Sequence, residues 1–360
     1  MKNKLSVLVV GCGNMGTSHA RAYAKLDEFK IAGLVSRGPE SRERLSGELG
    51  GLPTFDNFEK ALETTNPDAV CISTYPGTHA QYAIQALEAG AHVFVEKPIA
   101  ETTEMAETVV EAAMQADKKV IVGYILRHHP GWRQFVTSTE KLGKPLVMRM
   151  NLNQQSTGHE WDVHKSIMES MSPIVDCGVH YVDLMCQMTQ SDPVRVHAIG
   201  ARLTEDIQPD MYNYGQLQVV FEDGSVGWYE SGWGPMISEE SYFIKDVMGP
   251  KGSVSIHKKT SDEPRGISAD IGEHTTVKQL HIHSSELDSE GNLKHKDKLI
   301  NAPEQPGHDE LCLFEQQYFL KAIREDLDLS DHLKEVVNTL KIVLAADQSV
   351  KTGTVIQLDK

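Results

Sequence analysis

The sequence predicts a doubly wound parallel α/β sheet followed by an α+β domain with a large, mostly antiparallel open sheet. Short apolar runs alternate with helix-like segments up to residue 124, which is typical of parallel strands joined by helices. Beyond Tyr124 the rhythm changes to longer alternating segments with few helices between them. The chain, at 360 residues, also exceeds the roughly 250–300 residues at which one hydrophobic core stops growing. We therefore expect two domains, at residues 1–124 and 125–360.

Each element of the first domain follows from a local pattern. The run from Leu5 to Val10 is apolar and rich in β-branched residues and ends at Gly11, as expected for a strand buried on both faces. A helical pattern then continues to about Asp27. The same reasoning predicts further strands at 30–35, 69–73, 91–95 and 119–123, and further helices at 40–49, 56–64, 77–90 and 102–116.

The second domain is predicted from segments in which apolar and polar residues alternate. They indicate strands at 145–153, 194–203, 214–221, 225–231, 241–248 and 252–257. The tripeptide Glu222-Asp223-Gly224 between two of them is typical of a hairpin turn. Helices are expected near 175–189, 309–325 and 332–351. Two polar stretches, at 258–276 and 284–298, are expected to be surface loops.

The composition excludes several classes of protein. With 35 basic and 51 acidic residues, the formal net charge is −16. This charge disfavours nucleic acid as a partner, because such binding rests on basic patches. No run of about 18 apolar residues is present, so we expect no membrane span. The five cysteines lack CxxC spacing, which argues against a disulfide framework and a structural zinc site. We expect a cytoplasmic protein with reduced thiols.

A glycine-rich turn follows the first strand and opens the first helix. Its G-x-G-x-x-G pattern is Gly11-Cys12-Gly13-Asn14-Met15-Gly16. In this context the first glycine permits a tight turn, the second lets the backbone approach a pyrophosphate, and the third lets the helix pack close to the strand. The helix N-terminus offers free N–H groups to the anion. The turn therefore predicts a Rossmann domain that binds a dinucleotide.

The end of the second strand bears on which dinucleotide is bound. NAD is usually held there by an acidic residue that accepts hydrogen bonds from the ribose hydroxyls. This chain has Ser36 and Arg37 instead. A hydroxyl and a guanidinium suit the 2′-phosphate of NADP, because arginine pairs with phosphate oxygens. We favour NADP, although an Arg37 that only caps the loop or stacks on adenine would accept NAD as well.

The tripeptide Glu96-Lys97-Pro98 comes directly after the strand at 91–95. Ligands of open α/β sheets bind outside the carboxyl ends of the strands, so Lys97 is placed to face the nicotinamide. A lysine there could hold a substrate hydroxyl or transfer its proton. A proline at this point has a raised chance of a cis peptide bond. From the residues alone, a surface lysine without a role in the reaction is as well supported as a lysine that faces the nicotinamide.

Taken together, these motifs resemble the glucose–fructose oxidoreductase/inositol dehydrogenase (Gfo/Idh/MocA) family. The matching segments are the glycine turn with His19, Ser73-Thr74-Tyr75-Pro76 with His79, Glu96-Lys97-Pro98, Asp176-Cys177-Gly178-Val179-His180 and the tail Ser349-Val350-Lys351-Thr352-Gly353. The resemblance covers nearly the whole chain. One departure is Ser170-Met171-Ser172-Pro173, where the family often has glycines, and it puts the local backbone shape and substrate contacts in doubt.

Three residues are expected to be catalytic. Asp176 and His180 are four residues apart on the helix predicted at 175–189, with Asp183 three further on, so they share one face. Alone, this spacing would also suit a helix salt bridge. Histidine titrates near neutral pH and can exchange a hydroxyl proton as hydride leaves carbon. The resemblance implies that Lys97 works with this aspartate and histidine.

The remaining site predictions concern binding. The residues expected at the dinucleotide are Gly11, Gly13, Asn14, Met15, Gly16, Ser36, Arg37, Ser73, Thr74, Tyr75, His79, Glu96 and Lys97. Arg127, and Trp161 and His164 in a loop-like stretch, are candidates for substrate contact, although a structural role is as plausible for each. The pair His281 and His283 faces one side of a strand, and no nearby carboxylate or cysteine cluster completes a ligand set, so we expect no metal.

By resemblance, the protein is expected to be an NAD(P)-dependent dehydrogenase or reductase acting on a secondary alcohol or ketone of a sugar, polyol or sugar derivative. One alternative is cleavage of a glycosidic bond by transient oxidation and elimination with tightly bound NAD. A second is a non-catalytic dinucleotide sensor, against which the three catalytic candidates argue. An open antiparallel sheet usually needs covering, so a homodimer or homotetramer is expected.

Overall fold

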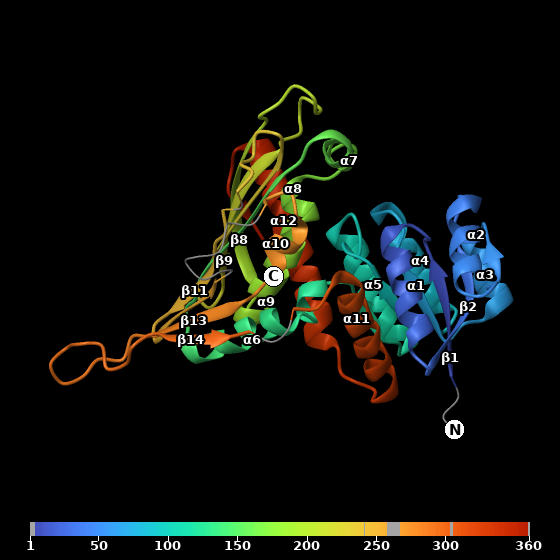
Figure 1. Cartoon of the computed structure of the whole chain (residues 1–360), viewed down its shortest axis with the longest axis horizontal. Coiled ribbons are helices and arrows are strands. Elements are labelled where there is room, and N and C mark those ends of the chain that lie inside the picture. The colour runs from blue at the N-terminus through green and yellow to red at the C-terminus, as the bar shows by residue number, and fades with distance from the viewer. Residues whose placement is uncertain (1–3, 241, 258–266, 303–304, 359–360) are drawn as a thin grey trace. The chain divides into compact units, whose positions relative to one another are not determined.

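The computed structural model describes residues 4–240, 242–257, 267–302 and 305–358. The chain forms two compact units (Figure 1). The first consists of the chain up to His128 together with Pro306–Val337, and the second of His129–Gln305 together with the chain from Asn338 onward. Each unit is built on one sheet, and the two sheets are of the kinds that the sequence predicts.

Within the described residues, the first unit contains a six-stranded parallel sheet in the order β3-β2-β1-β4-β5-β6. Its strands are β1 (Leu5–Val10), β2 (Phe29–Val35), β3 (Thr54–Phe55), β4 (Ala69–Ile72), β5 (His92–Val95) and β6 (Val120–Val122). The helices between them are α1 (Asn14–Lys25), α2 (Pro39–Glu48), α3 (Phe58–Thr65), η1 (Pro76–Thr78), α4 (His79–Glu88) and α5 (Thr103–Ala116), and η2 (Ile125–Arg127) follows β6. The strand order reverses between β1 and β4, which is where doubly wound sheets bind ligands.

The first unit is completed by a helix from the far end of the chain. Phe319 and Ala322 of α11 (His308–Arg324) are fully buried in the same core as Val7 of β1 and Phe94 of β5. The rings of Phe94 and Phe319 lie 6.2 Å apart. This burial explains why residues 306–337 belong to the first unit, whereas the sequence analysis draws one boundary at residue 124 and assigns everything after it to the second domain.

Among the described residues of the second unit, nine strands form one sheet in the order β14-β13-β12-β11-β7-β10-β9-β8-β15. They are β7 (Val147–Gln155), β8 (Pro193–Ala201), β9 (Tyr214–Phe221), β10 (Val226–Gly234), β11 (Lys245–Gly249), β12 (Gly252–His257), β13 (Gln279–Ser284), β14 (Lys298–Asn301) and β15 (Ile356–Gln357). The pair β7 and β10 is parallel, and the other pairs are antiparallel. The hairpin between β13 and β14, orange in Figure 1, projects well beyond the sheet.

Helices cover one face of this sheet. They are α6 (Pro130–Thr139), α7 (Gly158–Ile167), α8 (Pro173–Asp176), α9 (Gly178–Thr189), α10 (Ile271–Thr275) and the C-terminal part of α12 (Ser330–Thr352), and the 3₁₀ turn η3 (Glu140–Leu142) follows α6. The residues of β8 alternate, so that Val196 and Ala198 are buried while His197 and Ile199 are exposed. Such alternation is typical of a sheet with one covered and one open face.

Three local expectations were wrong. The helix expected at 175–189 is two helices, α8 and α9, which meet at Cys177. The stretch that contains Trp161 and His164 is the helix α7 and not a loop. The loop expected at 258–276 includes α10, whose His274 is fully buried, while its residues 258–266 lie outside the described residues, as does residue 241 of the expected strand 241–248.

We predict that Phe319→Ala destabilises the protein by about 3–5 kcal/mol, because it empties a fully buried aromatic site in the core of the first unit. Urea unfolding followed by fluorescence and circular dichroism measures the change. The matched control is Lys321→Ala, whose side chain on the same helix is more than half exposed. A loss for Phe319→Ala no larger than for the control would contradict the assignment of α11 to this core.

Candidate cofactor site and catalytic residues

The glycine turn has the backbone shape that its pattern predicts. Gly11 has a φ angle of +98°, and a Cβ atom added to it would lie 2.2 Å from the backbone oxygen of Ser73. A Cβ added to Gly16 would lie 1.9 Å from the oxygen of Gly11. Gly11 and Gly16 are therefore required by the packing of the protein itself. At Gly13 an added Cβ would meet no protein atom within 4 Å, which leaves this side of the turn open to a ligand.

The N-terminus of α1 fits an anionic group. Its N-cap residue is Gly13, no side chain caps the helix, and the first turn contains no acidic residue. Gly13 and Asn14 are exposed, and Met15 is partly exposed. The backbone N–H groups of this turn and the positive end of the helix dipole are thus available to a pyrophosphate. The residues present fit the dinucleotide that the motif implies.

The end of β2 presents two arginines. Arg37 is exposed, and Ser36 is partly buried with its hydroxyl 3.3 Å from that of Ser41. The guanidinium of Arg42 donates to the backbone oxygens of Ser36, at 2.7 Å, and Arg37, at 3.2 Å. Arg42 therefore fixes the loop that carries Ser36 and Arg37. The sequence analysis missed Arg42, because no motif in the sequence indicates that its side chain folds back onto this loop.

The loop after β4 is held by a buried histidine. His79 is 1% exposed, and its Nδ1 and Nε2 atoms lie 2.7 Å and 2.9 Å from the backbone oxygens of Pro98 and Thr74. Burial lowers the pKa of His79, although these two hydrogen bonds act in the opposite direction. A buried ring bonded to backbone on both sides positions the two loops. Tyr75 is 78% exposed in the same loop.

Glu96 and Lys97 occupy the turn after β5. The Lys97–Pro98 peptide bond is cis. Lys97 is partly exposed, whereas Glu96 is buried. Glu96 accepts a hydrogen bond from the backbone N–H of Lys97 at 3.2 Å, and its other oxygen lies 2.7 Å from Nε2 of His19 on α1. The turn that carries Lys97 is therefore anchored to the helix that carries the glycine turn.

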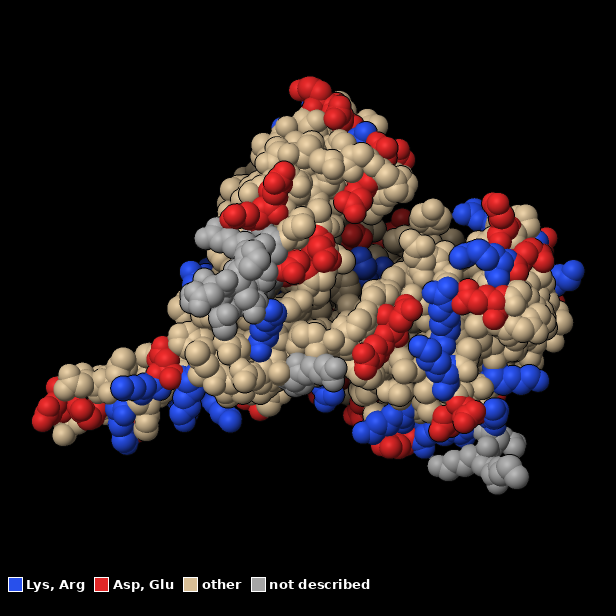
Figure 2. All heavy atoms as spheres, in the orientation of Figure 1, with Lys and Arg blue, Asp and Glu red and all other residues tan. Residues whose placement is uncertain are grey.

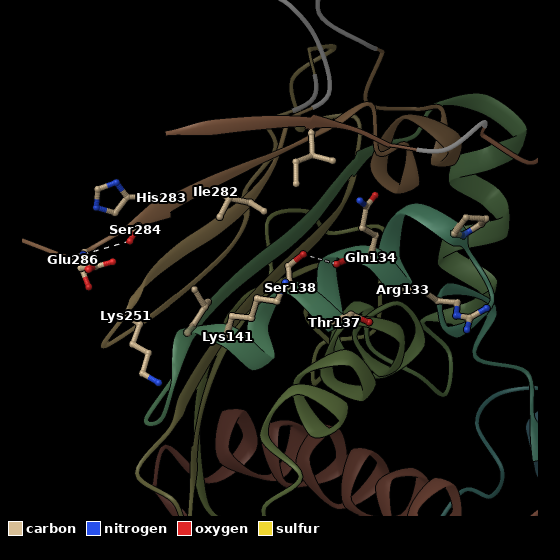
Figure 3. A pocket seen from close by; sticks show the side chains of 14 residues that line it. Arg133, Gln134, Thr137, Ser138, Lys141, Lys251, Ile282, His283, Ser284 and Glu286 are labelled. Atoms are coloured by element: carbon tan, nitrogen blue, oxygen red, sulfur yellow. Dashed lines mark hydrogen bonds between the residues drawn. The ribbon is translucent and has the colours of Figure 1, made fainter. Parts of the chain in front are cut away.

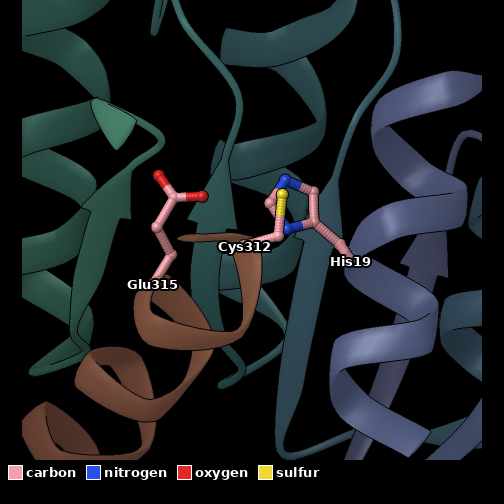
Figure 4. A group of neighbouring side chains, drawn as sticks. All are labelled: His19, Cys312 and Glu315. Atoms are coloured by element: carbon pink, nitrogen blue, oxygen red, sulfur yellow. The ribbon is translucent and has the colours of Figure 1, made fainter. Parts of the chain in front are cut away.

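Figure 4 shows that α11 contributes further polar groups to this interior. His19, Cys312 and Glu315 each offer one atom that could bind a metal ion, and these atoms lie within 4.8 Å of one another. All three side chains are buried. Both ring nitrogens of His19 are already engaged, one by Glu96 and the other by Gln316 at 3.0 Å. The ring of His19 is therefore already bonded on both sides within this interior.

In the second unit, Asp176 and His180 flank the junction of α8 and α9. Asp176 is the last residue of α8, and His180 lies in the first turn of α9. Both are partly exposed within a stretch whose other residues are mostly buried. Asp183, which the sequence analysis placed on the same face, is instead 1% exposed and accepts a hydrogen bond from Gln187 at 2.9 Å.

The segment that departs from the family pattern forms the start of α8. Ser172 is the N-cap, and its hydroxyl accepts a hydrogen bond from the N–H of Val175 at 3.2 Å. The same hydroxyl donates to Asp347 at 2.6 Å, and Asp347 also accepts a hydrogen bond from Tyr212. A serine followed by Pro173 is a favourable helix start, so this chain fixes the position of Asp176 with a capped helix.

The three substrate candidates have well-defined contacts. Within the first unit, Arg127 forms an ion pair with Glu335 at 2.8 Å. His164 of α7 is buried, stacks on Trp233 with ring centroids 4.4 Å apart, and lies 2.8 Å from the hydroxyl of Ser156. Burial lowers the pKa of His164 to about 4. Trp161 is 7% exposed. His164 and Trp161 are thus largely interior residues of their unit.

A carboxylate lies beside His281 and His283, which the sequence analysis did not foresee. Asp297, directly before β14, places its two carboxylate oxygens 2.9 Å and 2.7 Å from ring nitrogens of these histidines. Each distance is that of a direct hydrogen bond between carboxylate and imidazole. The contacts hold the base of the β13–β14 hairpin.

A cavity of about 960 Å³ lies between α6 and β13 in the second unit. Its lining includes Arg133, Ser138 and Lys141 of α6 and η3 together with Lys251 and His283 (Figure 3). None of the residues predicted to bind cofactor or substrate lines it.

Acidic and basic side chains are intermingled on the face of the molecule drawn in Figure 2. No helix among the described residues has the length and apolar character needed to cross a membrane.

The family models decide the identity of the fold. Residues 5–124 match the model described as "Oxidoreductase family, NAD-binding Rossmann fold", and residues 134–255 match the "GFO/IDH/MocA C-terminal domain". The chain belongs to the Gfo/Idh/MocA family. These two matches confirm the resemblance that the sequence motifs indicate.

Curated relatives of this Gfo/Idh/MocA chain are dehydrogenases of polyols and sugar derivatives. Inositol 2-dehydrogenase of Agrobacterium fabrum is 26% identical over 54% of this chain and 57% of its own length. UDP-N-acetylglucosamine 3-dehydrogenase of Acidithiobacillus ferrooxidans is 28% identical over 55% and 58%. The chain thus matches a little over half the length of these two relatives. The scyllo-inositol 2-dehydrogenase (NAD(+)) of Bacillus subtilis is 24% identical over 100% of this chain and 98% of its own.

Solved structures share the whole fold. An NAD-binding oxidoreductase from Klebsiella pneumoniae has a TM-score of 0.80 at 18% identity, covering 99% of this chain and 100% of that one. Scyllo-inositol dehydrogenase from Lactobacillus casei, solved with NAD(H) and scyllo-inositol, has a TM-score of 0.76 at 21% identity, covering 99% of both chains. At this level of identity the likeness shows the fold.

We predict different effects for two glycines of the turn. Gly13→Ala leaves the thermal unfolding midpoint close to that of the wild type, because the added methyl group meets no protein atom. It weakens dinucleotide binding by about tenfold or more, because the methyl group occupies the path of the pyrophosphate. Gly16→Ala instead lowers the midpoint, because its Cβ collides with Gly11. Calorimetry and fluorescence titration check both; equal effects of the two variants would contradict these assignments.

Proposed function

We propose that this protein catalyses the reversible, NAD(P)-dependent oxidation of a secondary alcohol on a sugar, polyol or sugar derivative. The observation that carries the proposal is the arrangement of the first unit, in which the ligand-open glycine turn and Lys97 both follow carboxyl ends of the parallel sheet. The family membership and the names of the relatives agree with it. Nicotinamide would supply hydride transfer, and the protein would supply binding, orientation and proton transfer.

We assign proton transfer to Lys97, Asp176 and His180. Lys97 is partly exposed, and its backbone N–H is bonded to Glu96, so the turn is anchored while part of the lysine side chain reaches the surface. Asp176 and His180 are partly exposed polar residues of a helical segment that is otherwise mostly buried. A lysine or imidazole close to its titration range can take the hydroxyl proton as the hydride leaves.

We assign NADP as the preferred cofactor. No acidic side chain follows β2 directly, and Ser36 and Arg37 occupy the place of the usual ribose-binding carboxylate. Arg42 bonds the two backbone oxygens of this loop, which adds a second positive charge beside the position expected for the 2′-phosphate. Two guanidinium groups favour a phosphate over a free hydroxyl.

We also assign a homodimer or homotetramer formed through the open face of the second sheet. Exposed apolar side chains such as Ile199, Val226 and Met248 lie on its strands. Covering them by a second copy would remove apolar area from water. Light scattering at micromolar concentration tests this, and a monomer would exclude it.

We predict that Arg37→Ala raises the dissociation constant for NADPH by about tenfold or more, because it removes a charged contact to the phosphate. The constant for NADH changes little, since NADH lacks that phosphate. Energy transfer from tryptophan to nicotinamide, titrated with each nucleotide, measures both constants. Arg195→Ala, an exposed arginine on β8, is the control. Tighter binding of NADH than NADPH by the wild type would overturn the NADP assignment.

We predict that Lys97→Ala lowers kcat by about two to four orders of magnitude, as expected for loss of a group that exchanges protons. The substrate is first found by a screen of sugars and polyols with the preferred nucleotide. Lys60→Ala, an exposed lysine on α3, is the control. Near-normal turnover by Lys97→Ala would exclude its proposed role.

Release of sugar from a glycoside without net nucleotide turnover would instead indicate cleavage by transient oxidation and elimination.

A further inference from the structure

Behind the Lys97 turn lies a buried polar cluster that the proposed reaction does not use. It consists of Tyr23 and His19 on α1, Glu96 after β5, and Glu315 and Gln316 on α11. His19 and Gln316 are 0% exposed and Glu315 is 1% exposed. Such groups are stable inside a protein only when their hydrogen bonds and charges are compensated.

The hydrogen bonds of this cluster run in one direction. The hydroxyl of Tyr23 donates to Oε1 of Gln316 at 2.5 Å, so the amide NH₂ of Gln316 faces Nδ1 of His19 at 3.0 Å and donates to it. A ring whose Nδ1 accepts carries its proton on Nε2. His19 therefore donates from Nε2 to Glu96 at 2.7 Å. The acceptor of this hydrogen bond is the carboxyl group of Glu96.

Glu315 has no such support. Both of its carboxyl oxygens are buried, and neither has a hydrogen-bond partner among the residues that the structure describes. An oxygen of this group lies within 4.8 Å of a ring nitrogen of His19 and of the Cys312 sulfur. The one N–H that the His19 ring carries is already directed to Glu96. A negative charge on Glu315 would thus be buried within the electrostatic influence of Glu96, with no hydrogen-bond donor to compensate it in the described part of the chain.

The titratable groups that surround Glu315 also favour its neutral form. They are His19 and Tyr23 on α1, Cys71 on β4, Glu96 after β5, and Cys312 on the same helix as Glu315. Burial first, and then the negative charge of Glu96, raise the pKa of Glu315 well above its usual value. Burial likewise raises the pKa of the Cys312 thiol, which keeps that group uncharged.

We propose that Glu315 is held as a neutral carboxylic acid and acts as a positioning residue for the Glu96–Lys97 turn. With Glu315 neutral, Glu96 carries the charge of the cluster, and its oxygens remain bonded to His19 and to the Lys97 N–H. Loss of the Glu315 proton would place two carboxylates side by side, and their repulsion would displace the turn that presents Lys97. The catalytic part of this inference rests on the proposed function, whereas the protonation of Glu315 does not.

The sign of the pH effect follows from linkage. A buried acid with a raised pKa binds its proton more tightly in the folded state than in the unfolded one. Its cost to stability is absent at acid pH and grows as the pH rises from the usual glutamate value of 4.5 towards the raised value. Glu315→Gln keeps the neutral shape and removes this cost, so its thermal midpoint exceeds that of the wild type by an amount that widens with pH.

The experiment compares Glu315→Gln, Glu315→Ala and the control Glu310→Gln, an exposed residue of the same helix. Infrared spectra are expected to show the C=O stretch of a protonated carboxyl in the wild type and its absence in Glu315→Gln. With substrate, we expect Glu315→Gln to keep kcat within about twofold of the wild type at neutral pH and to move the alkaline fall of kcat to higher pH. We expect Glu315→Ala to lower kcat by about tenfold with a smaller change in KM.

Three results would overturn the proposal. They are a Glu315→Gln variant as impaired as Glu315→Ala, a midpoint difference that does not change with pH, and stoichiometric zinc in the purified protein that is lost in Glu315→Gln. If no substrate is found, the proposed function fails by itself. The infrared band, the midpoint difference and the nucleotide affinity of Glu315→Ala then still decide the protonation of Glu315 and its hold on the turn.

Discussion

The hydrogen bond between His19 and Glu96 is the contact on which the candidate cofactor site depends. It joins α1, whose N-terminus faces the expected pyrophosphate, to the turn that carries Lys97. Both side chains are buried, so water does not compete for the bond and its electrostatic strength is high. The spacing between the phosphate-binding turn and the candidate catalytic lysine is therefore set by an interior contact and not by surface loops.

Other interior contacts extend this frame along the carboxyl edge of the sheet. His79 bridges the backbone oxygens of Thr74 and Pro98, which ties the loop after β4 to the turn after β5. α11 supplies Gln316, which orients the His19 ring, and Asp309, which accepts a hydrogen bond from Ser18 of α1 at 2.8 Å. The dinucleotide-binding fold is thus completed by α11, a helix about 180 residues after β6 in the chain. Without α11 the ring of His19 would lose the hydrogen bond that orients it.

The second unit presents its candidate residues from rigid elements as well. Ser172 caps α8 and is bonded to Asp347 of α12, so the segment that carries Asp176 is fixed at its start. The short break at Cys177 separates Asp176 from His180 without removing either from the partly exposed surface of the segment. Groups that lie on helices, and whose helices are held by further hydrogen bonds, are placed more accurately than groups on loops.

The sequence by itself determined the two sheets, the glycine turn and the positions of Ser36, Arg37, Lys97, Asp176 and His180 along the elements, because these depend on local periodicity and on motifs of a few residues. Tertiary structure decided the rest. The sequence showed neither the return of α11 to the first core nor the contact of Arg42 with its loop, and it gave no sign of the partners of Glu96 or of Asp297 beside two histidines. Apart from the short return of Arg42 to its own loop, these contacts join residues 14 or more positions apart in the chain, which meet only when the chain folds, and local patterns carry no record of that meeting.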